Sequence, residues 1–511
     1  MRLRSILLLV FFTFLLCFSK AQDDNEVKFL VRPELEEMRA NPVWETFGHS
    51  DDFFFCVRSD RRKKNEFLIE KIGVDSLTVL NTTNFTPPAI NGKAPVLAFP
   101  LSTEDASFLI ATAEDTEGSG IYIMAYQITD DLNIKKEPAV IGIGDREALI
   151  SENGFLIFKS KDEKKIVLFV PQEKNPARNE KFELRYLNSS LNLIESKNIE
   201  IPYPSAMVML EKAVLSSDGT FHGVISIQKE SEVRILPDSY ALLTYNPVEE
   251  GIKEKALSLG NKWFYDLNLT MTSDTNLWLA GYYSNMVEPS MVGTFSVVID
   301  SKTGEPLNTG LSPFDRDFRL MFRKEIKNRE DDLSLFKVDD TILKSNGSLS
   351  IISEKRYIRE STVYNPASRM YSVIQIHYHE ELLISTIEPS SKITENILIP
   401  KYQSSSQNYE RYTSYVSTEW GDKLLIFYND HFRNESLSPI EYNEYRAVNN
   451  QNNILITYCI LSNGSVEKKT LNSEIVDGYY LDANQPYRTS KSQILTAYKG
   501  YKTRYIKVLT P

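Results

Sequence analysis

Histidine and cysteine are scarce in this chain of 511 residues, which has five His and three Cys. Cys17 lies in an apolar run near the N-terminus, so only Cys56 and Cys459 remain in the rest of the chain. Two cysteines can form one disulfide but not a disulfide framework. Both lie in apolar, strand-like runs, "FFFCV" and "LITYCIL", and this context favours buried, unreactive thiols.

The sequence also lacks the short motifs that mark several classes of enzyme. It has no G-x-S-x-G nucleophile elbow, no phosphate-binding loop and no dinucleotide fingerprint. An excess of basic residues is missing too, because 69 Asp and Glu outnumber 58 Lys and Arg to give a net charge of -11. Nucleic-acid binding, which needs a basic face to replace phosphate counterions, is therefore not expected.

Only one long apolar run occurs, and it lies at the N-terminus. Arg2 and Arg4 precede apolar residues from Ile6 to Phe18, and Ser19-Lys20-Ala21 follows. This order predicts a secretory signal peptide over residues 1–21, cut after Ala21, and a mature domain over residues 22–511. The run is shorter than the roughly 20 residues of a membrane span, so we expect a protein exported to the periplasm or the cell exterior that does not span the membrane.

What the mature chain does contain is a repeat of short apolar runs. Eight runs share a polar or Gly-containing start followed by apolar residues, and their first large apolar residues recur every 47 to 75 positions. These anchors are Phe53, Phe108, Phe155, Phe221, Leu277, Leu349, Leu424 and Ile494. A second apolar run that ends in an Asp, Asn or Gly turn follows most anchors, as in "IYIMAYQITDDL" from Ile121. Each pair of runs predicts an antiparallel sheet of about four strands.

Repeats of four strands at this spacing resemble β-propellers in general, although no specific propeller motif is present. The resemblance implies an all-β fold, a single propeller of about eight four-stranded blades, with seven as the alternative. The last unit is one strand short, and "EVKFLVR" (Glu26 to Arg32) stands unpaired at the start of the mature chain. We therefore expect N- and C-terminal strands to close the ring together, since closure removes exposed strand edges.

Two histidines in "QIHYHEE" form the predicted metal site. His377 and His379 are two residues apart, so on a strand they point to the same face and could hold a divalent metal with a carboxylate. The alternative is an amphipathic outer strand with two solvent-facing imidazoles. No other cofactor is predicted.

Two insertions interrupt the repeat. In the segment from Asp315 to Asp332, apolar residues fall at helical spacing and predict an amphipathic helix packed on the propeller. The other insertion is a polar, Tyr-rich region spanning 402–415 and 439–453, and long loops on a rigid scaffold commonly bind ligands. Exposed aromatic side chains suit sugars and proteins, so the predicted binding residues are Tyr409, Tyr412, Trp420, Tyr442 and Tyr445.

These features support two hypotheses about function. The first is a binding or scaffold module for a protein or glycan partner, because the chain has a complete propeller repeat and no catalytic motif. The alternative is a carbohydrate-active enzyme, a glycosidase or polysaccharide lyase, with carboxylates at the central channel. Such an enzyme needs only Asp, Glu, Tyr and His, all of which are present.

Overall fold

A computed structural model gives the fold of the chain. It describes residues 27–31, 35–36, 43–59, 65–115, 120–146, 154–172, 177–228, 236–249, 251–273, 275–286, 291–323, 335–365, 369–406, 410–437, 445–448, 454–462, 464–471, 476, 478–490, 492–499 and 502–509. The predicted signal peptide lies outside these residues, and so do two of the predicted binding residues, Tyr409 and Tyr442.

Eight antiparallel sheets account for nearly all of the described structure. Blade 1 consists of β3 (Val43–Phe47), β4 (Phe53–Ser59), β5 (Phe67–Gly73) and β6 (Val79–Phe85). Blade 2 consists of β7 (Val96–Ser102), β8 (Ser107–Glu114), β9 (Gly120–Ile128) and β10 (Ala139–Asp145). Blade 3 consists of β11 (Leu156–Lys159), β12 (Lys165–Pro171), β13 (Asn179–Asn188) and β14 (Leu193–Pro204). Blade 4 consists of β15 (Val208–Leu215), β16 (Phe221–Ile227), β17 (Ser239–Tyr245) and β18 (Ile252–Leu257).

The second half of the ring repeats this pattern. Blade 5 consists of β19 (Trp263–Ser273), β20 (Asn276–Ser284), β21 (Met291–Asp300) and β22 (Pro306–Pro313). Blade 6 consists of β23 (Phe336–Leu343), β24 (Leu349–Asn365), β25 (Met370–Ile387) and β26 (Ile393–Ile399), with β27 (Gln403–Ser406) also paired to β25. Blade 7 consists of β28 (Tyr415–Trp420), β29 (Lys423–His431), β30 (Ile454–Ser462) and β31 (Ser465–Thr470). Blade 8 consists of β32 (Tyr480–Arg488), β33 (Ser492–Lys499), β34 (Lys502–Leu509) and β1 (Lys28–Val31), and the short β2 (Leu35–Glu36) also pairs with β34.

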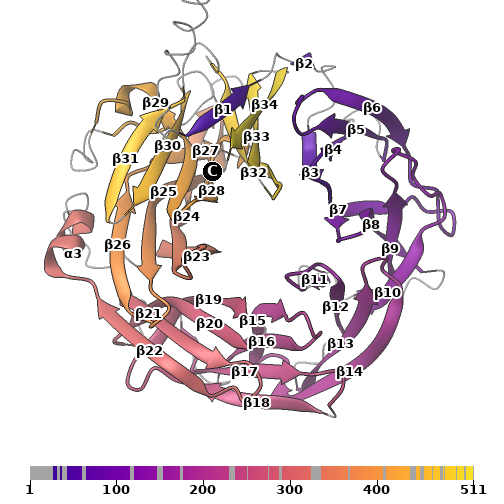
Figure 1. The fold of residues 1–511 in the computed structure, drawn as a ribbon, viewed down its shortest axis with the longest axis horizontal. Coiled ribbons are helices and arrows are strands. Elements are labelled where there is room, and N and C mark those ends of the chain that lie inside the picture. The colour runs from indigo at the N-terminus through magenta and orange to yellow at the C-terminus, as the bar shows by residue number, and fades with distance from the viewer. Residues whose placement is uncertain are drawn as a thin grey trace, which may run out of the picture.

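The eight sheets stand around a central axis, with the first strand of each sheet innermost (Figure 1). This arrangement is an eight-bladed β-propeller, as the sequence predicts. One hydrophobic cluster fills each of the eight interfaces between neighbouring blades, so every blade buries its faces against two others. Trp278 illustrates this packing, because it lies in the cluster that joins blades 5 and 6 and its indole Nε1 donates a 2.6 Å hydrogen bond to Ser296 Oγ.

The two ends of the chain close the ring within blade 8. Strand β1 pairs antiparallel with β34, from Lys28 opposite Leu509 to Val31 opposite Ile506, and forms the outer strand of that blade. Phe29 of β1 packs edge-on against Tyr458 of blade 7, with ring centroids 5.2 Å apart. The predicted closure by N- and C-terminal strands is confirmed.

Seven of the eight sequence anchors lie at or near the start of the second strand of a blade, but Phe155 does not. It precedes β11, the first strand of blade 3, and the second strand is β12, "KIVLFVP". Both strands are rich in apolar residues, so hydrophobicity alone cannot separate them. The wrong assignment explains why the spacings before and after Phe155 differ so strongly.

The other elements are short. Helix α3 (Arg316–Arg323) lies in the predicted helical insertion, and Phe318 is buried against Phe314 with ring centroids 5.0 Å apart. The 3-10 helix η2 (Glu410–Tyr412) precedes blade 7, and the 3-10 helix η3 (Phe432–Asn434) follows β29 within that blade. In the described ranges, no helix combines the length and the apolar character that a membrane span needs. Cys56 and Cys459 are buried free thiols, as predicted, and burial raises the pKa of Cys459 to about 12.

Candidate functional site

The long insertions of blades 5, 6 and 7 all lie on one face of the ring. Within a blade, the strands run alternately, so the connection from the second to the third strand and the connection to the next blade emerge where the first strand begins. Helix α3, the extension of β24 and β25, the segment 400–414 and the segment after β29 are all such connections. We call this side of the ring the insertion face.

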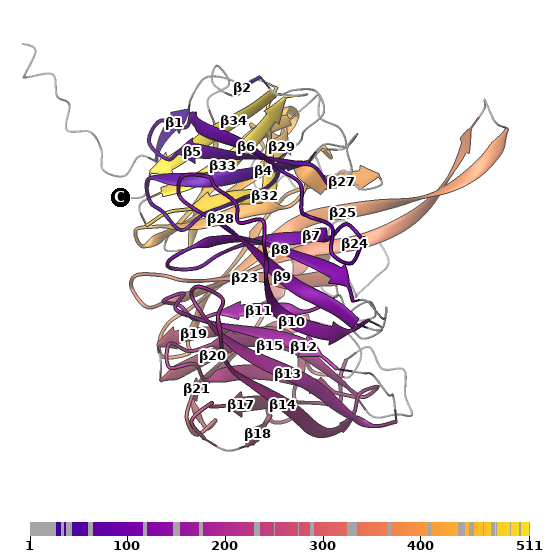
Figure 2. The same cartoon turned by 90° about the vertical axis from the view of Figure 1, so that its right-hand side faces the viewer.

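The most prominent feature of the insertion face is a long β-hairpin from blade 6. Strands β24 and β25 have 17 and 18 residues, and they continue to pair beyond the ring from Arg356 opposite His379 to Asn365 opposite Met370. We call these ten residue pairs the arm. Ten residues of β-strand span about 30 Å, so the arm reaches well beyond its blade, as Figure 2 shows.

The arm carries exposed apolar side chains on both of its faces. Cross-strand neighbours share a face, so Ile358, Tyr364, Tyr371 and Val373 lie on one side of the ribbon, and Met370 lies on the other. Tyr371 is 74%, Met370 63% and Val373 62% exposed. Natural surfaces rarely show such residues in one contiguous stretch without a binding role.

A stacked set of side chains stiffens the lower part of the arm. The rings of Tyr357 and Tyr378 stack at 4.7 Å, and the guanidinium of Arg359 lies 4.8 Å from the centre of the Tyr357 ring. Tyr357 is also the hydrogen-bond donor to Glu380 Oε1. Planar stacking and this hydrogen bond restrict the rotamers of the side chains on this side of the arm.

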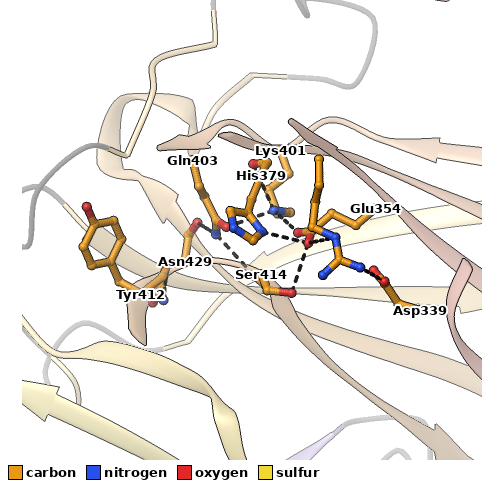
Figure 3. A network of polar contacts seen from close by, with 9 residues as sticks. Asp339, Glu354, His379, Lys401, Gln403, Tyr412, Ser414 and Asn429 are labelled. Carbon is orange, nitrogen blue, oxygen red and sulfur yellow. Dashed lines mark hydrogen bonds and ion pairs between the residues drawn. The ribbon is translucent and has the colours of Figure 1, made fainter. Parts of the chain in front are cut away.

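Beneath the arm lies a buried network of charged and polar groups (Figure 3). Glu354 Oε1 is 2.6 Å from Lys401 Nζ, and neither side chain is exposed to solvent. The other oxygen of Glu354, Oε2, lies 2.9 Å from His379 Nδ1 and accepts a 3.2 Å hydrogen bond from Ser414 Oγ. Burial alone would raise the pKa of Glu354, but the charge of Lys401 and the hydrogen bonds with His379 and Lys401 outweigh burial and hold the pKa below its usual value.

The network extends from the base of the arm into blades 7 and 8. Lys401 Nζ donates to Gln403 Oε1 at 2.9 Å, and Gln403 Nε2 donates to the Asn429 carbonyl at 2.8 Å. The side-chain amide of Asn429 in turn exchanges two 2.7 Å hydrogen bonds with the backbone of Leu481 in blade 8. We call this chain of contacts the clamp, because it links the arm, the connection 400–414 and two further blades.

A second buried group of charges lies in the β-bulge where the arm leaves blade 6. Pairing shifts register between Glu354 and Arg356, and Lys355 Nζ lies 2.9 Å from Glu380 Oε2 and 3.4 Å from Glu381 Oε2. Arg356 pairs with Asp339 of β23. Buried charges that are paired in this way hold a structure in one geometry, so we interpret the clamp and the bulge as support for the arm.

Three of the predicted binding residues are buried, which corrects the prediction that they are exposed. Tyr412 Oη donates to the Ser404 carbonyl at 3.0 Å, and Tyr445 Oη donates to the Leu437 carbonyl at 3.2 Å. Trp420 Nε1 donates to the Leu509 carbonyl at 3.2 Å and so links blades 7 and 8. All three side chains are less than 10% exposed. Their polar ends satisfy backbone carbonyls, so the aromatic residues of this region hold the loops together.

The two histidines lie at the base of the arm, on strand β25. His377 is half-buried opposite Ser405 of β27, whereas His379 is buried and contacts Glu354. Within the residues that the structure describes, no three His, Cys, Asp or Glu side chains are grouped to hold a metal ion. Metal binding by His377 and His379 therefore stays a prediction from the sequence.

A large cleft opens over blades 3 to 6 and was not predicted from the sequence. It has a volume of about 1180 Å³, and its lining includes the starts of β11, β15, β19 and β23, so it opens on the insertion face. Glu211, Asp266 and Tyr240 contribute polar groups to it. Burial raises the pKa of Glu211; a hydrogen bond with Ser226 opposes this rise, and the charge of Asp266 adds to it. The residues come from separate repeats, so no local motif could have indicated them.

Two carboxylates on the innermost strands serve as links between blades. Asp266 Oδ2 of blade 5 accepts a 2.8 Å hydrogen bond from the Val338 amide of blade 6. Asp340 Oδ2 of blade 6 accepts a 2.6 Å hydrogen bond from Ser417 Oγ of blade 7. Both residues follow a β-bulge in their strand, and the bulge directs the carboxylate toward the next blade.

The fold defines the chain as a β-propeller protein, and comparison with known proteins adds no family. No protein-family model matches the chain, and no curated protein matches its sequence. Solved propeller structures resemble it only loosely.

The Dos1 propeller is 9% identical, with 93% of this chain and 95% of that chain covered and a TM-score of 0.41. The WD40 domain of SCAP from fission yeast is 10% identical, with coverage of 94% and 98% and a TM-score of 0.36. The polysaccharide lyase Uly1 is 9% identical, with coverage of 83% and 94% and a TM-score of 0.36. Resemblances this distant carry no argument about function.

Proposed function

We propose that this protein is an exported scaffold propeller that binds a protein partner through the arm on its insertion face. The observation that carries the proposal is the arm itself: a ribbon outside the ring, supported by the clamp at its base, with Met370, Tyr371 and Val373 mostly exposed. A partner that covers these side chains would remove apolar surface from water.

The strand edges of the arm add to this argument. Along Arg356–Asn365, β24 pairs with β25 on one side, and its pairing with β23 has ended at Lys355. Strand β27 covers β25 only from Ile376 to His379. The described part of the arm therefore presents free backbone donors and acceptors along both edges, and a partner could extend it by strand addition. An isolated two-stranded hairpin is only marginally stable in water, so a bound partner would also stabilise the arm.

A protein partner fits these features better than a glycan. A sugar carries hydroxyl groups along its length and needs polar contacts throughout, whereas the outer end of the arm exposes the large apolar side chains of Met370, Tyr371 and Val373. In the carbohydrate-active alternative, the carboxylates at the central channel would have to act on the sugar, and two of them, Asp266 and Asp340, also link neighbouring blades.

The test is chemical cross-linking of the mature protein in the cells that produce it, followed by quantitative mass spectrometry. A variant with Met370→Ser, Tyr371→Ser and Val373→Ser should lose most of one specific cross-linked protein. Its matched control replaces three other exposed apolar residues, Leu193, Ile194 and Val248, with Ser and should retain that protein. Equal yields from both variants would refute the proposal, provided that both melt at the temperature of the wild type.

A further inference from the structure

The cleft over blades 3 to 6 combines apolar walls with a small cluster of polar groups. Its walls include Phe169, Phe182, Met207 and Leu236. The polar cluster is formed by Glu211, Asp266 and Tyr240, which lie close enough that both carboxylates affect the pKa of the phenol and Asp266 affects that of Glu211. Such a cavity matches a ligand that is mostly apolar and has one polar group.

Tyr240 provides a second, independent indication of a ligand. Its side chain is 94% buried, since only 6% is exposed, and it lines the cleft. With the described residues, the ring of Tyr240 packs against Phe264 at 5.0 Å but its hydroxyl forms no hydrogen bond. The hydroxyl oxygen itself is not enclosed by protein, because it reaches the cleft, and there it is available to a ligand.

The charges in the cleft determine which kind of ligand fits. Glu180, Glu211 and Asp266 contribute three carboxylates to the lining, and Lys337 is its only basic residue among those described. Lys337 is exposed, whereas Glu211 and Asp266 are half-buried. Burial raises the pKa of Glu211 although the charges of Lys337 and Lys212 oppose the rise, so a positively charged ligand would further stabilise the charged carboxylate.

We propose that the cleft binds an organic cation with an apolar stem, such as an alkylammonium group or a lysine side chain. The ammonium has three N–H donors, and Glu211, Asp266 and Tyr240 offer three acceptors for them. The stem lies along the apolar walls. Both oxygens of Asp266 already accept backbone hydrogen bonds, and each carboxylate oxygen can accept a second. This site is separate from the arm, so it stands or falls independently of the proposed function.

The test uses hexylammonium as the probe, with 1-hexanol as the uncharged ligand of the same stem. Saturation-transfer NMR with the mature protein measures binding of each. Hexylammonium should bind saturably and 1-hexanol at least about tenfold more weakly, because a hydrogen bond to a charged group is worth about one decade in affinity or more. Glu211→Gln should weaken hexylammonium binding by a similar factor, and Tyr240→Phe by a smaller one.

Glu249→Gln is the matched control, since Glu249 is an exposed carboxylate in the turn after β17, on the opposite face of the ring. This control should bind hexylammonium as the wild type does. Equal binding of hexylammonium and 1-hexanol would overturn the proposal, and so would undiminished binding by a folded Glu211→Gln variant. Preferential binding of neutral oligosaccharides would overturn it in favour of a sugar site. If Glu211→Gln fails to fold, the comparison of the two probes on the wild type still decides.

Discussion

Glu45 provides a quantitative test of how burial on an innermost strand changes the pKa of a carboxylate and the stability of the protein. It follows the bulge in β3, as Asp266 follows the bulge in β19 and Asp340 the bulge in β23. Asp266 and Asp340 accept hydrogen bonds from the next blade, but the Glu45 carboxylate has no hydrogen-bond or ion-pair partner among the described residues. Burial therefore raises the pKa of Glu45 from 4.5 to about 7. Replacing this carboxylate by an amide of the same shape should stabilise the protein at neutral and alkaline pH.

The magnitude follows from the pKa shift. A shift of about 2.5 units corresponds to about 3.4 kcal/mol, and partial exposure to water reduces this to roughly 2 kcal/mol. The folded state binds the proton more tightly than the unfolded state, so the wild type loses this stability as pH rises from about 4.5 through about 7. The free energy of unfolding of Glu45→Gln should therefore equal that of the wild type at pH 4 and exceed it by roughly 2 kcal/mol at pH 8.

Differential scanning calorimetry at pH 4, 6 and 8 measures this difference. For a chain of 511 residues the unfolding entropy is about 1 kcal/mol per degree, so the melting temperature should rise by about 2 °C at pH 8 and stay unchanged at pH 4. Glu249→Gln, an exposed carboxylate, serves as the control and should show no such pH dependence. A melting temperature of Glu45→Gln that is equal to or below the wild-type value at pH 8 would refute the reasoning.

Three further predictions concern the fold and its support of the arm. Glu354→Gln leaves the Lys401 ammonium buried without its partner and should destabilise the protein by about 3–5 kcal/mol in calorimetry; adding Lys401→Met should recover part of this loss, and no recovery would argue against a buried ion pair. Ser296→Ala removes the hydrogen-bond acceptor of the Trp278 indole and should lower the free energy of unfolding, measured by calorimetry, by about 1–3 kcal/mol. The control Ser390→Ala, in an exposed turn, should not lower it by that amount. Deleting β1 should lower the melting temperature, and a peptide of residues 26–32 should restore it in part, because β1 completes blade 8; an unchanged melting temperature would contradict ring closure by this strand.

The sequence predicts the fold well because each repeat carries its own local pattern. The runs at Phe53, Leu277 and Leu424 are apolar throughout because neighbouring blades cover both faces of those strands. The single wrong anchor, Phe155, directly precedes a first strand that is rich in apolar residues, like the second strand beside it. Terminal closure was predictable because an unpaired strand at one end matched a missing strand at the other.

The candidate sites were harder to predict, because they depend on contacts between repeats. Glu211 and Asp266 lie in different blades, and Glu354 and Lys401 meet only because β24 and the segment after β26 are side by side. Tyr412 and Trp420 illustrate the opposite error. A polar, Tyr-rich loop suggests exposed aromatic residues, but here backbone carbonyls accept their hydrogen bonds and the rings are buried. For the arm, the sequence offers the longest interval between anchors, 75 residues from Leu349 to Leu424, but the interval does not show that β24 and β25 take up part of it.

The most direct test of the proposed function places a photoreactive amino acid at position 371, at the exposed end of the arm. The control carries the same group at position 248, in the turn between β17 and β18 on the opposite face, where Val248 is 91% exposed. Irradiation of cells that produce each variant should cross-link position 371 to one predominant protein and position 248 to none in comparable yield. Equal labelling from both positions, or none from position 371, would contradict the account of the arm as the binding element.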